Sequence, residues 1–177
     1  MELRSAAATD ALAIAETQVD AWQTAYRDIV AGTYLDEMSV ESRRSSWEYR
    51  LGGRVAIKPA TFVVESDPDG VVGFVSGGQN RGELSDYDAE LYAISVRPAH
   101  QRQGLGRRLL FECAAALDDQ GFGRLVLWEL AASPVRGFFD SVGGRVVGDR
   151  PIRLGDAEYP GVGYGWDDLG VLASQAD

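Results

Sequence analysis

The fold is decided by residues 91–110, which read LYAISVRPAHQRQGLGRRLL. The opening LYAISV mixes alternating and β-branched side chains, which predicts a strand, and Pro98 ends it. A glycine-containing turn then leads into a helix that places Leu105, Leu109 and Cys113 on one apolar face. The stretch therefore predicts a strand, a glycine turn and a helix in succession.

The turn between this strand and this helix has the properties of an anion site. Gly104 and Gly106 let the backbone turn without obstruction by a Cβ atom, so that amide N–H groups at the helix start converge. The helix dipole adds about half a positive charge there. Arg102, Arg107 and Arg108 add full charges in a chain whose formal net charge is -10. These charges favour a local phosphate site, although the glycine spacing alone fits equally well a turn that merely enters a helix.

Two common phosphate-binding loops are excluded by their spacing. A dinucleotide-binding turn needs a third glycine three residues after Gly106, where this chain has Leu109. A P-loop needs Gly-Lys followed by Ser or Thr, and this combination occurs nowhere in the chain. The turn therefore belongs to neither class.

The length and composition of the chain predict one globular domain. Its 177 residues are 45% hydrophobic and 25% charged, which suits a single well-packed core. We expect one domain over residues 1–169 and a flexible tail over residues 170–177. No apolar run approaches the roughly 18 residues that a membrane span needs, and the N-terminus lacks a secretory pattern. The expected location is cytoplasmic, without a membrane partner.

Charge and residue usage exclude further classes of function. The net charge of -10 opposes binding to nucleic acid, because such binding depends on neutralising phosphates with Lys and Arg. One cysteine and one histidine, Cys113 and His100, cannot form a thiolate and imidazole zinc site, so we expect no metal. The apolar surroundings of Cys113 favour a core thiol, and the surface position of His100 beside the turn favours a bystander.

The segments outside residues 91–110 predict further helices and strands. Helices are expected from the N-cap Thr9 to about Ile29, from the N-cap Ser39 to the Gly52-Gly53 stop, and from Ser133-Pro134 to Gly143-Gly144. Strands are expected at Leu3–Ala6, at 61–65 and 71–77 as an antiparallel hairpin, at 124–130, and in two runs within 145–155 and 159–169.

This order of elements, taken with the glycine turn, resembles the GNAT superfamily of N-acetyltransferases. The family pattern is a strand, a basic or glutamine residue, two spacers, Gly, any residue, then Gly or Ala, and Gln101, Gly104 and Gly106 occupy those places. Trp22 and Tyr26 in the first helical region extend the resemblance, which covers most of the chain. It implies an α/β fold of GNAT type: a mixed, mostly antiparallel sheet with a central splayed parallel strand pair and helices on both faces.

The resemblance also implies acetyl-CoA as co-substrate and a set of residues that bind it. The pyrophosphate is expected on the turn that follows Gln101, at the backbone amides of Arg102, Gln103, Gly104, Leu105, Gly106 and Arg107. Pantetheine is expected to pair with the strand edge of Ile94, Ser95 and Val96, because in this family that strand splays from its parallel neighbour. A backbone N–H around Ile94 would then stabilise the developing oxyanion.

A general base is needed because a protonated ammonium has no lone pair with which to attack a thioester. Glu90, at the start of the same strand, is the leading candidate, acting directly or through water, and the family often has an acidic residue at this place. A solvated loop charge is an equally good reading of Glu90. For Asp86 and Asp88 the solvated reading is favoured.

Two positions depart from the family pattern. Many members have an asparagine after the second parallel strand and a tyrosine that protonates the departing thiolate. The matching positions here are Ala132 and Phe139. We therefore expect acetyl transfer to a primary amine of a small molecule or peptide, with a non-catalytic acyl-CoA-binding module as the rival. Trp22 and Tyr26 fit acceptor-pocket lining and core packing equally well, and a homodimer is compatible with the resemblance.

Overall fold

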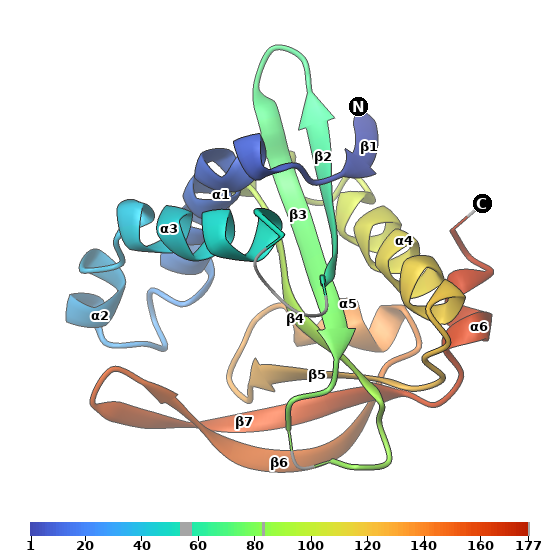
Figure 1. Cartoon of the computed structure of the whole chain (residues 1–177). Coiled ribbons are helices and arrows are strands. Elements are labelled where there is room, and N and C mark those ends of the chain that lie inside the picture. The colour runs from blue at the N-terminus through green and yellow to red at the C-terminus, as the bar shows by residue number, and fades with distance from the viewer. Residues whose placement is uncertain (54–57, 83, 177) are drawn as a thin grey trace.

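The computed structural model describes residues 1–53, 58–82 and 84–176, which form one strongly twisted seven-stranded sheet in the order β1-β2-β3-β4-β5-β7-β6 (Figure 1). The strands are β1 (Glu2–Ser5), β2 (Ala60–Ser66), β3 (Gly70–Gln79), β4 (Ala89–Val96), β5 (Leu125–Leu130), β6 (Arg145–Leu154) and β7 (Ala157–Trp166). The β4–β5 pair is parallel, and the other five neighbouring pairs within the described ranges are antiparallel. This architecture confirms the fold class expected from the sequence.

Helices cover both faces of this sheet. They are α1 (Ala11–Ala25), α2 (Gly32–Asp36), α3 (Val40–Leu51), α4 (Leu105–Asp119), α5 (Arg136–Ser141) and α6 (Leu169–Ala173), with short 3-10 turns at Ala8–Asp10 and Pro98–His100. On one face, α1 and α3 bury Ile14 and Trp47 against Phe74 of β3. On the other face, α4 buries Leu109 and Cys113 in a second core. Burial raises the pKa of Cys113 to about 12, which confirms a core thiol.

The parallel strands β4 and β5 separate part-way along their length. Their pairing is limited to Ala89–Leu91 on β4 and Leu125–Leu127 on β5. Opposite β3, the register shifts between Ser76 and Gly77, so that Tyr92 is an extra residue on β4. Such a bulge bends a strand and disturbs its ladder. The second half of β4 therefore has no β5 partner, as the predicted splay requires.

The first helix differs from the sequence prediction at both ends. Thr9 lies inside the 3-10 turn instead of capping the helix. Asp10 stands at the N-cap position of α1, and its Oδ2 accepts the N–H of Ala7, the residue before the 3-10 turn, at 2.8 Å. The helix ends at Ala25 and not near Ile29, because Tyr26 leaves the helical conformation and its hydroxyl donates to Glu129. Contacts distant in sequence thus override the local pattern.

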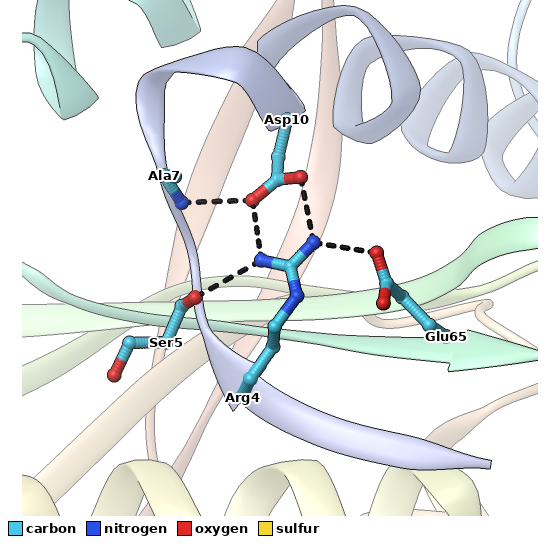
Figure 2. Close-up of polar contacts among 5 residues, drawn as sticks. All are labelled: Arg4, Ser5, Ala7, Asp10 and Glu65. Atoms are coloured by element: carbon cyan, nitrogen blue, oxygen red, sulfur yellow. Dashed lines mark hydrogen bonds and ion pairs between the residues drawn. The ribbon is translucent and has the colours of Figure 1, made fainter.

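Arg4 joins three elements at this end of the molecule. Figure 2 shows its guanidinium between the carboxylates of Asp10, before α1, and Glu65, on β2. The Asp10 side chain is mostly buried, whereas those of Arg4 and Glu65 are about one-third exposed. The hydrogen bonds from Arg4 lower the pKa of Asp10, and the N–H of Ala7 adds to this effect. The cluster therefore ties β1 and the start of α1 to β2.

The ends of α3 agree with the sequence, but the start of α5 does not. The predicted cap Ser133 accepts the N–H of Val135, and the helix begins only at Arg136. Ser39 caps α3 by accepting the N–H of Ser42 at 3.1 Å, and α3 ends at Leu51 before the predicted Gly52-Gly53 stop. Part of the segment predicted as a tail is helical, because α6 buries Leu172 and contacts α4. The domain boundary at residue 169 stays a prediction. No helix in the described ranges has the length and apolar character needed to cross a membrane.

Candidate active site

The predicted phosphate turn has an unusual backbone conformation immediately before α4. Arg102 has φ 62° and Gly104 has φ 80°, both in the left-handed region. Alternation of left-handed and ordinary residues turns successive N–H groups toward one point, and the start of α4 adds its own N–H groups. The side chain of Gln101 donates to the carbonyl of Val96 at 3.0 Å and so fastens the turn to the end of β4.

Gly106 serves a purpose other than the one inferred from the sequence. It lies in α4 with an ordinary φ, so it does not form the tight turn. A Cβ at this position would lie 3.4 Å from the ring of Phe138, which shows how closely α5 approaches α4. Gly104 is the residue whose conformation requires glycine.

The basic side chains of the turn are available to an anion. Arg102, Arg107 and Arg108 are exposed, and within residues 1–53, 58–82 and 84–176 none of them forms an ion pair. His100 lies 3.1 Å from Asp69 of the β2–β3 turn instead, in agreement with its expected bystander role. Leu105 is buried, so that only its backbone can face a ligand.

The free edge of β4 leads from this turn toward the predicted base. Ile94, Ser95 and Val96 pair with β3 on one side and are partly exposed. On the other side, β4 has left β5 after Leu91. An unpaired strand edge presents N–H and C=O groups that a ligand with amide groups can satisfy. The contacts of these residues with pantetheine stay a prediction.

Glu90 lies inside the strand and is not a solvated loop charge. Only 8% of the residue is exposed. Its Oε2 accepts the backbone N–H of Arg81 at 3.1 Å and lies 3.5 Å from Nε of the same residue. The Arg81 guanidinium in turn stacks 3.7 Å from the ring centre of Tyr92. The β3–β4 loop therefore holds this carboxylate in place at the point where β4 bends.

Asp88 is exposed, as the sequence favours, but it also has a structural role. Its carboxylate accepts the N–H groups of Gly123 and Arg124 at 2.8–3.1 Å, just before β5 begins. Burial opposes ionisation of Asp88, but these donors outweigh it, so that its pKa lies below the ordinary value. Asp88 therefore fixes the start of β5 beside β4. Its sequence position carries no sign of this role.

A second buried carboxylate, which the sequence analysis did not single out, lies beyond the point of separation on β5. Glu129 follows Leu127 by two residues, is 8% exposed, and accepts the Tyr26 hydroxyl at 2.7 Å and the N–H of Leu130 at 2.8 Å. Burial raises the pKa of Glu129, and these hydrogen bonds oppose the rise only in part. Burial and the Glu129 charge raise the pKa of Tyr26 well above its ordinary range, so the phenol remains a donor.

Phe139, which stands where many family members have a tyrosine, is fully packed. Phe139 is 2% exposed, and its ring centre lies 5.4 Å from that of Tyr164 on β7. The Tyr164 hydroxyl accepts from Nε of Arg136 at 3.1 Å, while Ser141 donates to the carbonyl of Phe138. A phenolic hydroxyl is therefore present near Phe139, although it comes from another strand.

A cleft opens on the α3 side of β4. It has a volume of about 610 Å³ and is lined by Ser45, Ser46, Tyr49, Arg50, Pro59, Arg81 and Tyr92. Arg81 thus borders both this cleft and Glu90, and Tyr92 lines the cleft beneath the Arg81 guanidinium. The α3 residues of this cleft could not be found from the sequence, because their helical spacing resembles that of any exposed helix.

The chain is similar to known proteins over most of its length. The model of the acetyltransferase (GNAT) family matches residues 19–143. The chain belongs to the GNAT acetyltransferase family. It is 32% identical over 170 residues to the protein named uncharacterized N-acetyltransferase YuaI of Bacillus subtilis (strain 168), covering 96% of this chain and 95% of that protein.

Solved structures of GNAT proteins share the fold. A GCN5-related N-acetyltransferase from Rhodopseudomonas palustris has a TM-score of 0.74 at 16% identity, covering 94% of each chain. The acetyltransferase yncA from Salmonella typhimurium, described with acetyl-CoA, has a TM-score of 0.67 at 23% identity, covering 94% of this chain and 93% of that one. As a member of the family, this GNAT protein is an acetyltransferase with acetyl-CoA as co-substrate.

Proposed function

We propose that this GNAT protein transfers an acetyl group from acetyl-CoA to a primary amine, with Glu90 as general base. The observation that carries the proposal is the continuity of three features along β4. A left-handed turn with three exposed arginines lies at one end, an unpaired strand edge lies in the middle, and a buried carboxylate lies at the other end. Coenzyme A has a phosphate part, an amide-containing arm and a reactive thioester in the same order.

The residues of the turn and of the strand edge suit the two parts of the coenzyme. The backbone amides from Arg102 to Arg107 would hold the pyrophosphate, with Gln101 fastening the turn to β4. The edge from Ile94 to Val96 would pair with the pantetheine amides. When bound, acetyl-CoA supplies the activated acetyl group. A backbone N–H around Ile94 would donate to the oxyanion that develops on the thioester carbonyl.

Glu90 would accept the proton of the incoming ammonium, directly or through one water. The backbone N–H of Arg81 orients the carboxylate, and 11% of the Glu90 side chain remains exposed. The amine nitrogen then attacks the thioester carbon, the bond between carbon and sulfur breaks, and the second proton that the nitrogen loses passes to water. A thiolate with a pKa near 8.5 is an adequate leaving group, so that water can protonate it without a tyrosine at position 139.

The rival function is a non-catalytic acyl-CoA-binding module, which Phe139 and Ala132 favour. The two are separated by measuring release of the free coenzyme thiol across a panel of primary amines, with coenzyme A binding measured by calorimetry in parallel. We expect binding together with thiol release that requires an amine. Binding with no turnover on any amine of the panel would favour the rival.

A further inference from the structure

The cleft beside Glu90 contains a partly buried cation without a counter-ion. Arg50, on the last turn of α3, stacks 5.2 Å from the ring centre of Trp47. Among the residues that the structure describes, no carboxylate lies within ion-pair distance of its guanidinium. Burial lowers the pKa of Arg50, and the charges of Arg81 and Arg43 lower it further. In a chain of net charge -10, a site where arginines repel one another is suited to an anion.

This anion is not a phosphate of the coenzyme. The coenzyme turn precedes α4, which packs on one face of the sheet, whereas α3 packs on the opposite face. The cleft lies on the α3 side of β4, and Arg81 connects it to Glu90, since the same side chain lines the cleft and lies 3.5 Å from the Glu90 carboxylate. A ligand in the cleft would therefore place its anionic group a short distance from the proposed base.

We propose that the acceptor is a small amino acid-like molecule, whose carboxylate binds Arg50 and Arg81 while its amine faces Glu90. This inference rests on the proposed function and specifies its substrate class. A volume of about 610 Å³ suits a small molecule. Planar guanidinium groups match a carboxylate with paired hydrogen bonds, and their stacking on Trp47 and Tyr92 fixes their orientation.

The test compares matched acceptors that differ only in this charge: free amino acids and the corresponding amino acid amides. For the parent protein we expect a kcat/KM roughly 10- to 100-fold higher for the acid than for its amide, because a hydrogen-bonded charge pair has about that effect. In Arg50→Gln this preference should shrink by about tenfold relative to the parent, and Arg50→Lys should retain part of it. Coenzyme A affinity should not change in either variant.

Arg44→Gln is the matched control. Arg44 lies on the same helix but pairs with Glu41 and Glu48 at the surface, and it does not line the cleft. This variant should keep the full preference of the parent. Equal rates for acid and amide in the parent, or an unchanged preference in Arg50→Gln, would overturn the inference.

A second measurement separates failure of this inference from failure of the proposed function. If no amine is acetylated although coenzyme A binds, the proposed function has failed. Binding of the same acids and amides to the coenzyme A complex, followed by NMR titration, then still tests the cleft. Tighter binding of the acids that weakens in Arg50→Gln would support the carboxylate site, and indistinguishable binding of acids and amides would overturn it.

Discussion

The turn proposed to hold the coenzyme and the side proposed to hold the acceptor are built in different ways in this GNAT protein. The turn comes from one contiguous stretch, residues 101–107, and its shape depends on backbone conformation at Arg102 and Gly104. The acceptor side brings together α3, the β3–β4 loop, β4 and β5, and depends on hydrogen bonds and charges of side chains. A site of the first kind is sensitive to a single Cβ atom, whereas one of the second kind is sensitive to a single charge.

The largest effect is expected from removing the charge of Glu90. Glu90→Gln should lower turnover near neutral pH by about 100-fold or more, because loss of a general base has this magnitude. The defect should shrink as the pH approaches the pKa of the acceptor amine, where the amine arrives neutral. Coenzyme affinity should stay unchanged. Steady-state rates from pH 6 to 10 provide the measurement.

Asp86→Asn is the control for Glu90→Gln, since it neutralises an exposed carboxylate of the preceding loop. It should leave the pH profile unaltered. Full turnover of Glu90→Gln at neutral pH would show that another group is the general base.

A smaller effect, on binding, is expected from adding a Cβ atom at Gly104. Gly104→Ala forces a side chain into φ 80°, which costs about 1–2 kcal/mol unless the turn relaxes. Relaxation would move the N–H groups that are proposed to hold the pyrophosphate. We expect coenzyme affinity to fall about tenfold, measured by calorimetry.

Gly121→Ala is a matched control at the other end of α4. Gly121 has φ 89° and, like Gly104, open space around a Cβ, so the loss of stability should be similar. Its coenzyme affinity should equal that of the parent. If both variants bind coenzyme A normally, the turn does not hold the phosphates.

A cluster of charges outside both sites should affect stability alone. Asp10→Asn removes the charge that pairs with Arg4 and should lower the free energy of unfolding by about 1–3 kcal/mol at pH 7. Because the folded state lowers the pKa of Asp10, this contribution is present above about pH 4 and is lost as the pH falls through the folded-state value. Urea unfolding at pH 3 and pH 7 measures it.

Glu65 is the more exposed partner of Arg4, so its loss can be compared with the loss of Asp10. Glu65→Gln should lower the free energy of unfolding by less than about 1 kcal/mol. Turnover at saturating substrate should not change in either variant. A loss of the same size for Asp10→Asn at pH 3 and at pH 7 would contradict the assigned pKa shift.

The smallest effect is expected at Glu129. The pKa of Glu129 is raised in the folded protein. Its contribution to the free energy of unfolding is therefore greatest below the pKa of the group in the unfolded chain, about 4.3, and declines as the pH rises through the folded-state pKa. Glu129→Gln keeps an oxygen for Tyr26 and Leu130 but carries no charge. It should abolish this decline and raise the free energy of unfolding at pH 8 by about 0.5–1 kcal/mol.

Tyr26→Phe provides the opposite change at the same contact. It removes a donor to the buried carboxylate and should lower the free energy of unfolding by about 1 kcal/mol. Urea unfolding between pH 5 and pH 8 tests both variants. If the free energy of unfolding of the parent rises over this interval and the rise is absent in Glu129→Gln, the carboxylate is stabilised in its ionised form and the assigned pKa shift is wrong.

Features that depend on neighbouring residues could be predicted from the sequence. The strand, turn and helix of residues 91–119, the Ser39 cap and the apolar setting of Cys113 are set by local spacing and composition. The error at Thr9 arose because Asp10 stands at the N-cap position instead, where it is held by Arg4 of β1. Local propensity is weak compared with a partly buried charge pair.

The sequence by itself determined the order of elements and the turn, because hydrophobic period and backbone preference act over a few residues. Only the tertiary structure decided the acceptor side. Tyr26 and Glu129 are 103 residues apart in the chain, yet their side chains share a buried hydrogen bond. Arg50 comes to border the same cleft as Arg81 only after α3 has packed on the sheet. Such contacts follow from burial of whole helices and strands, and they leave no periodic mark in the sequence.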